Sequence, residues 1–223
     1  MKRRSAKKAI ELIEDGMVIG LGGGETIGYL VEYLSQSPKH VSVVTPSFDT
    51  EQACMKARLP VLPLWMADHV DIAFDGCDEV DHHMYALKSG GAIHTREKLI
   101  ASMSERYVLL IDESKYFDVL PFKHDITIEL LKEAYKYVES KINEIGGTMK
   151  LRKSPSKAGA VISDDGNFIA DVHFDTVKDI LELNKSLNDI YGIVATSLFV
   201  DLVTDLIISN EEETYIIGGS KNV

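Results

Sequence analysis

The feature that most restricts the fold is the alternation of short apolar runs with amphipathic segments through the first half of the chain. Residues 107–111 form an uninterrupted apolar run of strand length, whereas residues 26–34 space their apolar side chains along one face of a helix. We expect strands at residues 17–21, 41–45, 61–65, 70–74 and 107–111, and helices at 26–34, 50–57 and 95–104. This order predicts an α/β fold with a Rossmann-like, mainly parallel sheet. Because ligands bind beyond the carboxyl ends of such strands, we expect the site in the loops after residues 21, 74 and 111.

The pattern changes after about residue 122 and predicts a smaller inserted lobe of α+β, ferredoxin-like type. The expected elements are strands at 125–129, 148–153, 160–163 and 168–174, and helices at 130–145 and 177–188. Three later apolar runs, at 192–197, 202–208 and 214–217, are expected to rejoin the first sheet. The predicted division is therefore a catalytic domain of residues 1–122 plus 193–223, and a lobe of residues 123–192.

Composition narrows the possible partners. A net charge of −11 argues against a general nucleic-acid partner, although a local cationic pocket can still hold one anionic substrate. No apolar run reaches the 18 residues that suggest a membrane span, and the basic first 16 residues lack the apolar stretch of a signal peptide. The two cysteines form neither a disulfide framework nor a zinc motif, so we expect a cytoplasmic protein. Hydrophobic residues make up 45% of the chain, enough for a core that should include Trp65.

A glycine-rich segment, residues 20–28, separates the first strand from the next helix. Backbone N–H groups in such a loop can approach an anion at a helix N-terminus. The dinucleotide-binding pattern is incomplete, because Gly28 follows Gly24 by four positions and not three. A phosphate site and a purely structural turn both remain open, and Glu25 counts against the phosphate.

An acidic segment, residues 74–81, follows another expected strand. Asp75 closes the strand and Asp78 lies about one turn later, where two carboxylates can bind hydroxyl groups, transfer protons or hold a magnesium ion. A solvated acidic loop with Asx turns is the alternative interpretation.

A third segment, residues 88–98, combines Lys88 with Gly90, Gly91 and Glu97. A glutamate at the start of a helix is often only a partner of the helix dipole. To act as a base, Glu97 would need burial or a negative neighbour such as Asp75 or Asp78 to raise its pKa. Arg96 and Lys98 would lower it if they approached.

Residues 109–115 end in a fourth candidate, Lys115, which follows an apolar strand. Its ammonium group could neutralise a phosphate, or it could be an ordinary solvated lysine.

Taken together, these segments resemble the type A ribose-5-phosphate isomerases. The chain shows the order of that family: a glycine-rich loop, then Asp-Gly-x-Asp-Glu-Val-Asp, then Lys-x-Gly-Gly-x(5)-Glu-Lys, then Asp-Glu-Ser-Lys. Lys88 and Glu97 are nine residues apart, as in the family. The match extends over residues 16–115 and continues more weakly through residues 164–174 and 192–199.

The resemblance implies an enzyme that passes a proton between C2 and C1 of a phosphorylated pentose through an ene-diolate. It makes Glu97 the base, Asp75 and Asp78 substrate-contacting carboxylates, and Lys88 the active-site ammonium. It also implies homodimers or homotetramers and no metal or organic cofactor. The implied substrate-binding set is Gly23, Gly24, Glu25, Thr26, Asp75, Gly76, Cys77, Asp78, Lys88, Ser89, Gly90, Gly91 and Lys115.

The phosphate end departs from the family pattern. The family loop Gly-Thr-Gly-Ser-Thr is here Gly22-Gly23-Gly24-Glu25-Thr26, which loses the first threonine hydroxyl and carries a carboxylate at the serine position. Ser89 also replaces a glycine, and Cys77 an alanine. Because a carboxylate facing a phosphate is repulsive, an isomerase for a different aldose or sugar phosphate, or a weakened sugar-phosphate-binding relative, remains an alternative.

Overall fold

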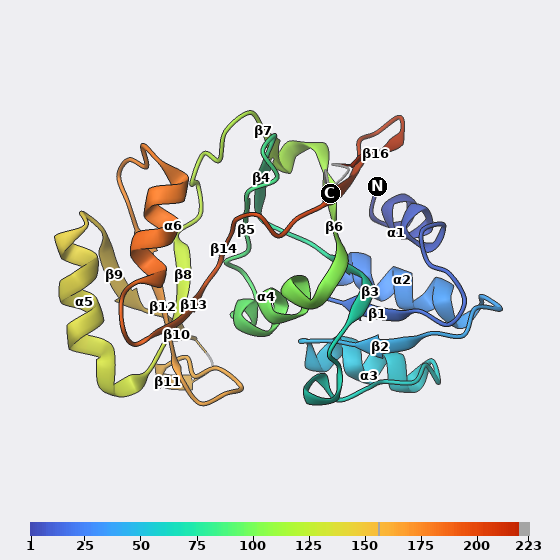
Figure 1. The fold of residues 1–223 in the computed structure, drawn as a ribbon, viewed down its shortest axis with the longest axis horizontal. Helices are drawn as coiled ribbons and strands as arrows, with labels where there is room; N and C mark the ends of the chain where they lie inside the picture. Colours follow the sequence, from blue (N-terminus) through green and yellow to red (C-terminus); the bar gives the residue numbers. More distant parts are fainter. Residues whose placement is uncertain (156, 219–223) are drawn as a thin grey trace.

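A six-stranded sheet forms the centre of the larger domain (Figure 1). The computed structural model describes residues 1–155 and 157–218. The strand order is β16-β15-β6-β3-β1-β2, with all neighbours parallel except the edge pair β15 and β16. The strands are β1 (Val18–Leu21), β2 (Ser42–Val44), β3 (Val70–Asp75), β6 (Ser104–Asp112), β15 (Asp205–Ser209) and β16 (Thr214–Gly218). The expectation of a mainly parallel sheet is confirmed, and the last two strands do rejoin it.

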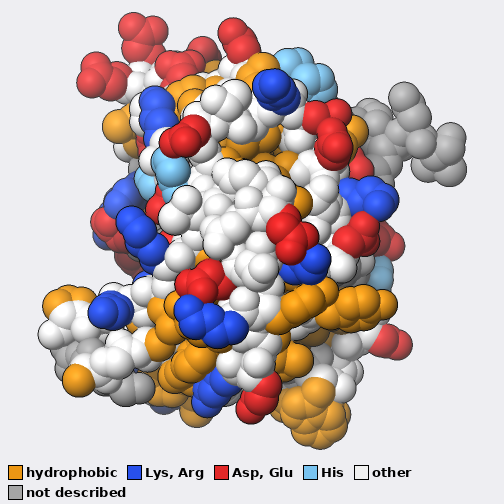
Figure 2. All heavy atoms as spheres, turned by 90° about the vertical axis from the view of Figure 1, so that its left-hand side faces the viewer, with side chains coloured by type: hydrophobic (Ala, Val, Ile, Leu, Met, Phe, Trp, Pro, Cys, Tyr) orange, Lys and Arg blue, Asp and Glu red, His pale blue; other side chains and the backbone are white. Residues whose placement is uncertain are grey.

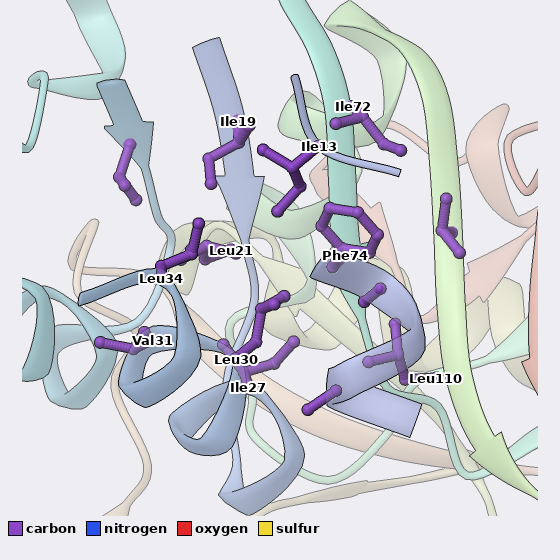
Figure 3. Packing of buried hydrophobic residues seen from close by; sticks show 14 of the residues in the cluster. Ile13, Ile19, Leu21, Ile27, Leu30, Val31, Leu34, Ile72, Phe74 and Leu110 are labelled. Carbon is purple, nitrogen blue, oxygen red and sulfur yellow. The ribbon is translucent and has the colours of Figure 1, made fainter. Parts of the chain in front are cut away.

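Four helices cover this sheet: α1 (Lys2–Ile10), α2 (Glu25–Ser35), α3 (Phe48–Lys56) and α4 (His94–Met103). Alternate residues of the strands point to opposite faces, as the pleat requires, so Val108 and Tyr107 of β6 belong to different cores. On one face, Ile27 and Leu30 of α2 pack with Phe74 (Figure 3). On the other face, Ile100 of α4 is part of the second core. Helix α4 is thereby fixed against the strands that precede the expected site.

The small lobe contains a four-stranded antiparallel sheet in the order β13-β8-β12-β9. Its elements are β8 (Ile126–Leu130), α5 (Tyr135–Glu144), β9 (Thr148–Leu151), β12 (Phe168–His173), α6 (Ile180–Asn188) and β13 (Ile193–Thr196). Both helices cover one face of the sheet (Figure 1), and the outer surface mixes acidic and basic side chains (Figure 2). This strand–helix–strand, strand–helix–strand order is the ferredoxin-like arrangement that was expected.

Strand β13 corrects the expected chain path. Residues 192–197 were expected to rejoin the first sheet, but Ile193 and Thr196 pair with β8. An apolar run does not specify its partner, and β13 covers the edge that the first strand of this lobe would otherwise leave open. We therefore propose that the lobe extends to about residue 197 and not to 192.

Several other expectations change because tertiary contacts override local pattern. Residues 61–65 are not a strand: Val61 makes one bridge to Val43, and Leu64–Met66 is a 3-10 turn, η1, whose Trp65 is 85% exposed and not in the core. In the lobe, α5 and α6 start later than expected, since the 3-10 turn η3 (Lys132–Ala134) precedes α5 and Asp179 caps α6. The strand expected at 160–163 is instead β11 (Lys157–Ala160), paired with β10 (Lys153–Ser154).

A further sheet of four short strands, which the sequence did not suggest, joins the two parts. Its order is β14-β5-β4-β7, formed by Leu198–Phe199, Ala86–Leu87, Glu79–Asp81 and Tyr116–Phe117. Strands of two or three residues are too short to show a period, so they leave no signal in the sequence. No helix in the described part of the chain has the length and apolar character needed to cross a bilayer.

Substituting Gly20 tests how closely α4 approaches the sheet. A Cβ at Gly20 would lie 2.5 Å from the Cβ of Ala73 and 2.7 Å from Cγ2 of Ile100. We expect Gly20→Ala to destabilise the fold by about 1–3 kcal/mol, through overpacking, and to lower the melting temperature by roughly 2–4 °C per kcal/mol. Gly28→Ala is the control, because nothing lies within 4 Å of its added Cβ in α2 and it should be neutral or stabilising. Equal melting temperatures in a calorimetric scan would contradict the close approach.

Candidate active site

Asp75 ends the central strand β3 and anchors the site. Its carboxylate is 3% exposed; Oδ1 accepts the backbone N–H of Gly76 at 2.8 Å, and Oδ2 accepts the hydroxyl of Tyr107 at 2.9 Å. The neighbouring strand leaves room for it only because residue 22 is glycine: a Cβ at Gly22 would lie 2.0 Å from Oδ1. The glycine-rich segment is therefore in part a requirement of this buried carboxylate.

Lys88 places its ammonium group between two carboxylates. Its Nζ lies 3.0 Å from Oδ2 of Asp75 and 3.4 Å from Oε1 of Glu97, and it also donates to the backbone carbonyl of Gly76. Lys88 and Glu97 are 6% and 7% exposed. Two carboxylates and one ammonium thus share a nearly dry space, so the charges act on one another with little screening.

This environment shifts the pKa of Glu97. Burial is the main cause and the charge of Asp75 adds to it; together they raise the pKa of Glu97 to about 8, against the opposing effect of Lys88. The two carboxylates raise the pKa of Lys88 despite its burial, so its ammonium stays charged. Both conditions set for a base, burial and a negative neighbour, are met at Glu97.

The two cations next to Glu97 in sequence point to other partners. Arg96 donates to the carboxylate of Asp165 at 2.6 and 2.9 Å. Lys98 donates to the hydroxyl of Thr196 at 3.2 Å and to the carbonyl of Leu198 at 2.9 Å. The sequence left open whether these cations lower the pKa of Glu97, and neither makes an ion pair with it.

The loop after Lys88 bends around Asp78. The backbone N–H groups of Ser89 and Gly90 donate to Oδ2 of Asp78, at 2.6 and 3.2 Å. The N–H of Lys88 donates to the carbonyl of Ser197 at 2.9 Å, which ties the same segment to the chain after β13. The backbone that carries Lys88 is therefore held by two segments: by Asp78, just before β4 (Glu79–Asp81), and by Ser197, just after β13.

These residues open into one cavity of about 530 Å³, a size suited to a small metabolite. Ten of the residues expected from the sequence line it: Gly23, Gly24, Asp75, Gly76, Cys77, Asp78, Lys88, Gly90, Gly91 and Glu97. Ser47, Phe48, Asp49, Ile93 and Asp164 also line it and were missed. Ser47 follows the carboxyl end of β2, so the expectation that ligands bind beyond the carboxyl ends of strands could have predicted it. Asp164 comes from the small lobe, and nothing in the sequence indicated its place in the site.

Four expected site residues do not line the cavity. Glu25 pairs with Lys2 at 2.5 Å and accepts the hydroxyl of Tyr29 at 2.7 Å, and these contacts lower its pKa. Thr26 lies in the first turn of α2. Ser89 donates to the carbonyl of Asp125 at 2.6 Å, and Lys115 donates to that of Cys77 at 2.7 Å. Ser89 and Lys115 thus support the backbone around the cavity.

The described residues do not provide a set of ligands for the magnesium ion that the sequence allowed near Asp75 and Asp78. They contain no group of three or more His, Cys, Asp or Glu side chains placed to hold a metal ion. The Asp75 carboxylate is engaged by Lys88, Tyr107 and Gly76. The thiol of Cys77 is a soft donor and does not suit magnesium, which takes oxygen ligands.

A Rossmann-like sheet with a buried carboxylate–ammonium–carboxylate group at its carboxyl edge defines an enzyme-like site for acid–base chemistry. Residues 42–213 match the profile of the family Ribose 5-phosphate isomerase A (phosphoriboisomerase A). The chain is 38% identical to ribose-5-phosphate isomerase A of Prochlorococcus marinus (strain MIT 9211), covering 100% of this chain and 94% of that protein. With the protein of that name from Thermococcus kodakarensis the identity is 36%, over 95% of both chains.

Solved structures agree with this similarity. Ribose 5-phosphate isomerase A from Methanocaldococcus jannaschii superposes with a TM-score of 0.90 at 34% identity, over 98% of both chains. A D-ribose-5-phosphate isomerase in complex with phospho-erythronic acid gives a TM-score of 0.92 at 32% identity, over 98% of this chain and 97% of that chain. The chain belongs to the ribose 5-phosphate isomerase A family.

Removing the Lys88 ammonium tests the electrostatic balance of the site. Because the ammonium favours the ionised form of Glu97, we expect Lys88→Met to raise the pKa of Glu97 above its value of about 8 in the unchanged protein. The measurement is a pH titration of ¹³C-labelled glutamate carboxyls by NMR, with Glu97→Gln to assign the resonance. Lys132→Met, at an exposed lysine of the small lobe, is the control and should leave that pKa unchanged. An unchanged or lower pKa in Lys88→Met would show that Lys88 does not act on Glu97.

Proposed function

We propose that this chain interconverts D-ribose 5-phosphate and D-ribulose 5-phosphate, with Glu97 as the base that moves the proton. The observation that carries the proposal is the buried Glu97 carboxylate, which lines the cavity 3.4 Å from the Lys88 ammonium. Similarity to ribose-5-phosphate isomerases along the full chain supports the substrate.

The proposed reaction needs one base because the two reacting carbons are adjacent. In the open-chain aldose, Glu97 removes the proton from C2, the C–H electrons form a C1–C2 double bond, and the carbonyl electrons move to O1. A proton then passes from O2 to O1 within the ene-diol. Glu97 returns its proton to C1 as O2 becomes the new carbonyl oxygen. The raised pKa of Glu97 matches this double role, since a carboxyl group that titrates near neutral pH can both accept and release a proton.

The developing negative charge is stabilised by Lys88. Asp75 lies 3.0 Å from the ammonium and next to the Glu97 carboxyl, and its oxygens also accept the hydroxyl of Tyr107 and the N–H of Gly76. We assign Asp75 the task of holding Lys88 in place. A charge fixed before the reaction and shielded from water stabilises an oxyanion with little reorganisation.

Asp78 is proposed to bind a substrate hydroxyl. Its side chain lines the cavity, and the two hydrogen bonds that it receives within the described part of the chain both reach Oδ2. Oδ1 can therefore accept a hydrogen bond from the sugar. The backbone of Gly76, Cys77, Gly90 and Gly91 completes this wall of the cavity.

Substituting the base tests the proposal directly. We expect Glu97→Gln to lower kcat for ribose 5-phosphate by at least about 10²- to 10⁴-fold, with KM nearly unchanged, because the amide keeps the shape but cannot accept the proton. Glu105→Gln, at an exposed glutamate of β6, is the matched control and should retain full activity. Full turnover by Glu97→Gln would rule out its role as the base.

An isomerase for another sugar, phosphorylated or not, is the second candidate, because the loop at 22–26 lacks the usual hydroxyls and carries Glu25. The geometry reduces this concern: the Glu25 carboxylate is paired with Lys2 and does not line the cavity. The pair nonetheless adjoins Gly24, which does line the cavity. Glu25 thus neutralises the Lys2 ammonium at the residue that follows Gly24.

Freeing Lys2 distinguishes these candidates. If the substrate phosphate lies near the 22–26 loop, Glu25→Ser should lower KM for ribose 5-phosphate, because it removes a negative charge and frees the Lys2 ammonium. KM for unphosphorylated ribose should not change. Glu32→Ser is the matched control, because Glu32 is also on α2 and pairs with Arg3 at 3.3 Å. A panel of phosphorylated and free pentoses and hexoses gives the readout; equal effects on phosphorylated and free sugars would contradict a phosphate at this loop.

The cellular setting is also part of the proposal. We propose a cytoplasmic enzyme of the non-oxidative pentose phosphate pathway that works without a cofactor and forms a homodimer or homotetramer. Exposed Trp65, Leu99 and Val194 line a second surface hollow, which supports self-association because gathered apolar side chains commonly mark contact surfaces. The net charge of −11 is consistent with partners other than nucleic acid.

A further inference from the structure

We infer that Arg152 of the small lobe is a positioning residue for the active site, acting through the backbone of the loop at residues 88–91. The inference rests on the proposed function, because it assigns Arg152 a role in the turnover that Lys88 and Glu97 carry out. Arg152 lies between β9 and β10, outside the cavity lining, and nothing in its sequence context suggests a link to Lys88.

Within the described residues, the Arg152 guanidinium makes four hydrogen bonds to three partners. Nη1 donates to the carbonyl of Gly90 at 3.2 Å, and Nη2 donates to the hydroxyl of Thr127 at 2.6 Å. Nε donates to Oδ2 of Asp171 at 3.0 Å, while Nη2 also donates to Oδ1. Only 21% of the arginine side chain and 26% of the Asp171 side chain are exposed. Such two-pronged, partly buried pairs are geometrically specific in a way that surface ion pairs are not.

The strands beneath these residues make the platform rigid. Asp171 of β12 and Thr127 of β8 are directly paired across the antiparallel sheet. The backbone N–H of Arg152 itself donates to the carbonyl of Ile169 in β12, at 2.9 Å. The guanidinium thus projects from a hydrogen-bonded sheet and has a defined position relative to the loop.

The loop needs this support because two of its residues are glycines. Arg152 binds the carbonyl of Gly90, and the Thr127 hydroxyl lies 3.1 Å from the carbonyl of Ser89. The N–H groups of the same two residues donate to Asp78. The peptide groups are therefore held from both sides, with their carbonyls toward the small lobe and their N–H groups toward Asp78. Without these contacts, glycine allows many other backbone conformations.

The geometry predicts a loss of turnover and not of binding. A displaced loop shifts Lys88 and Gly90 relative to the reacting carbons, and a shift of about 1 Å can cost up to about 100-fold in rate. We expect Arg152→Met to lower kcat for ribose 5-phosphate by about 10- to 100-fold with KM changed less than threefold. Arg152→Lys keeps the charge but not the planar fork, so we expect it to recover less than a third of the lost kcat. Millimolar guanidinium should raise the kcat of Arg152→Ala at least threefold by refilling the vacated site.

Arg106→Met is the matched control. Arg106 makes the same kind of two-pronged pair, with Asp205, at 2.9 and 3.2 Å, but near the amino end of β6 and away from the carboxyl edge that carries Asp75. It should retain normal kcat, and guanidinium should not activate Arg106→Ala. If Arg152→Met fails to fold, Asp171→Asn is the substitute, since it keeps the side-chain shape and weakens the hold on Arg152; the same kcat loss is expected.

The outcomes separate this inference from the proposed function. If the protein without substitutions has no activity on ribose 5-phosphate, the proposed function is wrong. An active unchanged protein whose Arg152→Met or Asp171→Asn variant keeps its kcat would overturn only the role of Arg152. Equal losses in the Arg152 and Arg106 variants, or no rescue by guanidinium, would also overturn it, because each would indicate general destabilisation.

Discussion

The arrangement depends on one buried ammonium group held between two buried carboxylates. Removing Lys88, Asp75 and Glu97 from water is costly, and the attraction among them compensates only where the geometry is good and the remaining polar atoms are satisfied. The surroundings meet these requirements: Tyr107 and the N–H of Gly76 bind Asp75, and the Gly76 carbonyl accepts from Lys88. Both carboxylates lie within 3.4 Å of the Lys88 ammonium, and burial together with Asp75 raises the pKa of Glu97 to about 8.

Each member of this group comes from a different kind of structure. Asp75 ends a central parallel strand, Lys88 follows a two-residue strand of the joining sheet, and Glu97 lies in the first turn of α4. The large sheet fixes Asp75 and, through the packing of Ile100, also the helix α4 that carries Glu97. Lys88 depends on contacts with the small lobe. The lobe therefore bears on the cavity although, among its described residues, Asp164 alone lines it.

The sequence predicted most of the large sheet, because its buried strands are long apolar runs and its helices are clearly amphipathic. Loop position singled out the segments that carry ten of the cavity-lining residues, and the resemblance to the type A ribose-5-phosphate isomerases supplied their expected membership of the site. The sequence could not predict the short strands, the partner of β13 or the exposure of Trp65, since these depend on contacts between distant segments. The direction of Glu25 was likewise unpredictable, because Lys2, 23 positions earlier, determines it. The roles given to these residues remain proposals.

The contact between Lys88 and the carbonyl of Ser197 has a consequence for protein synthesis. All the charged groups of the site leave the ribosome within the first half of the chain, but the strand pair that fixes Lys88 is made by residues near the end. β14, which pairs with the strand preceding Lys88, also comes from this late segment. A nascent chain that has already folded its first parallel strands therefore still lacks an ordered lysine. The backbone contacts that order Lys88 are complete only once residues 197–199 have been synthesised, long after the lysine itself.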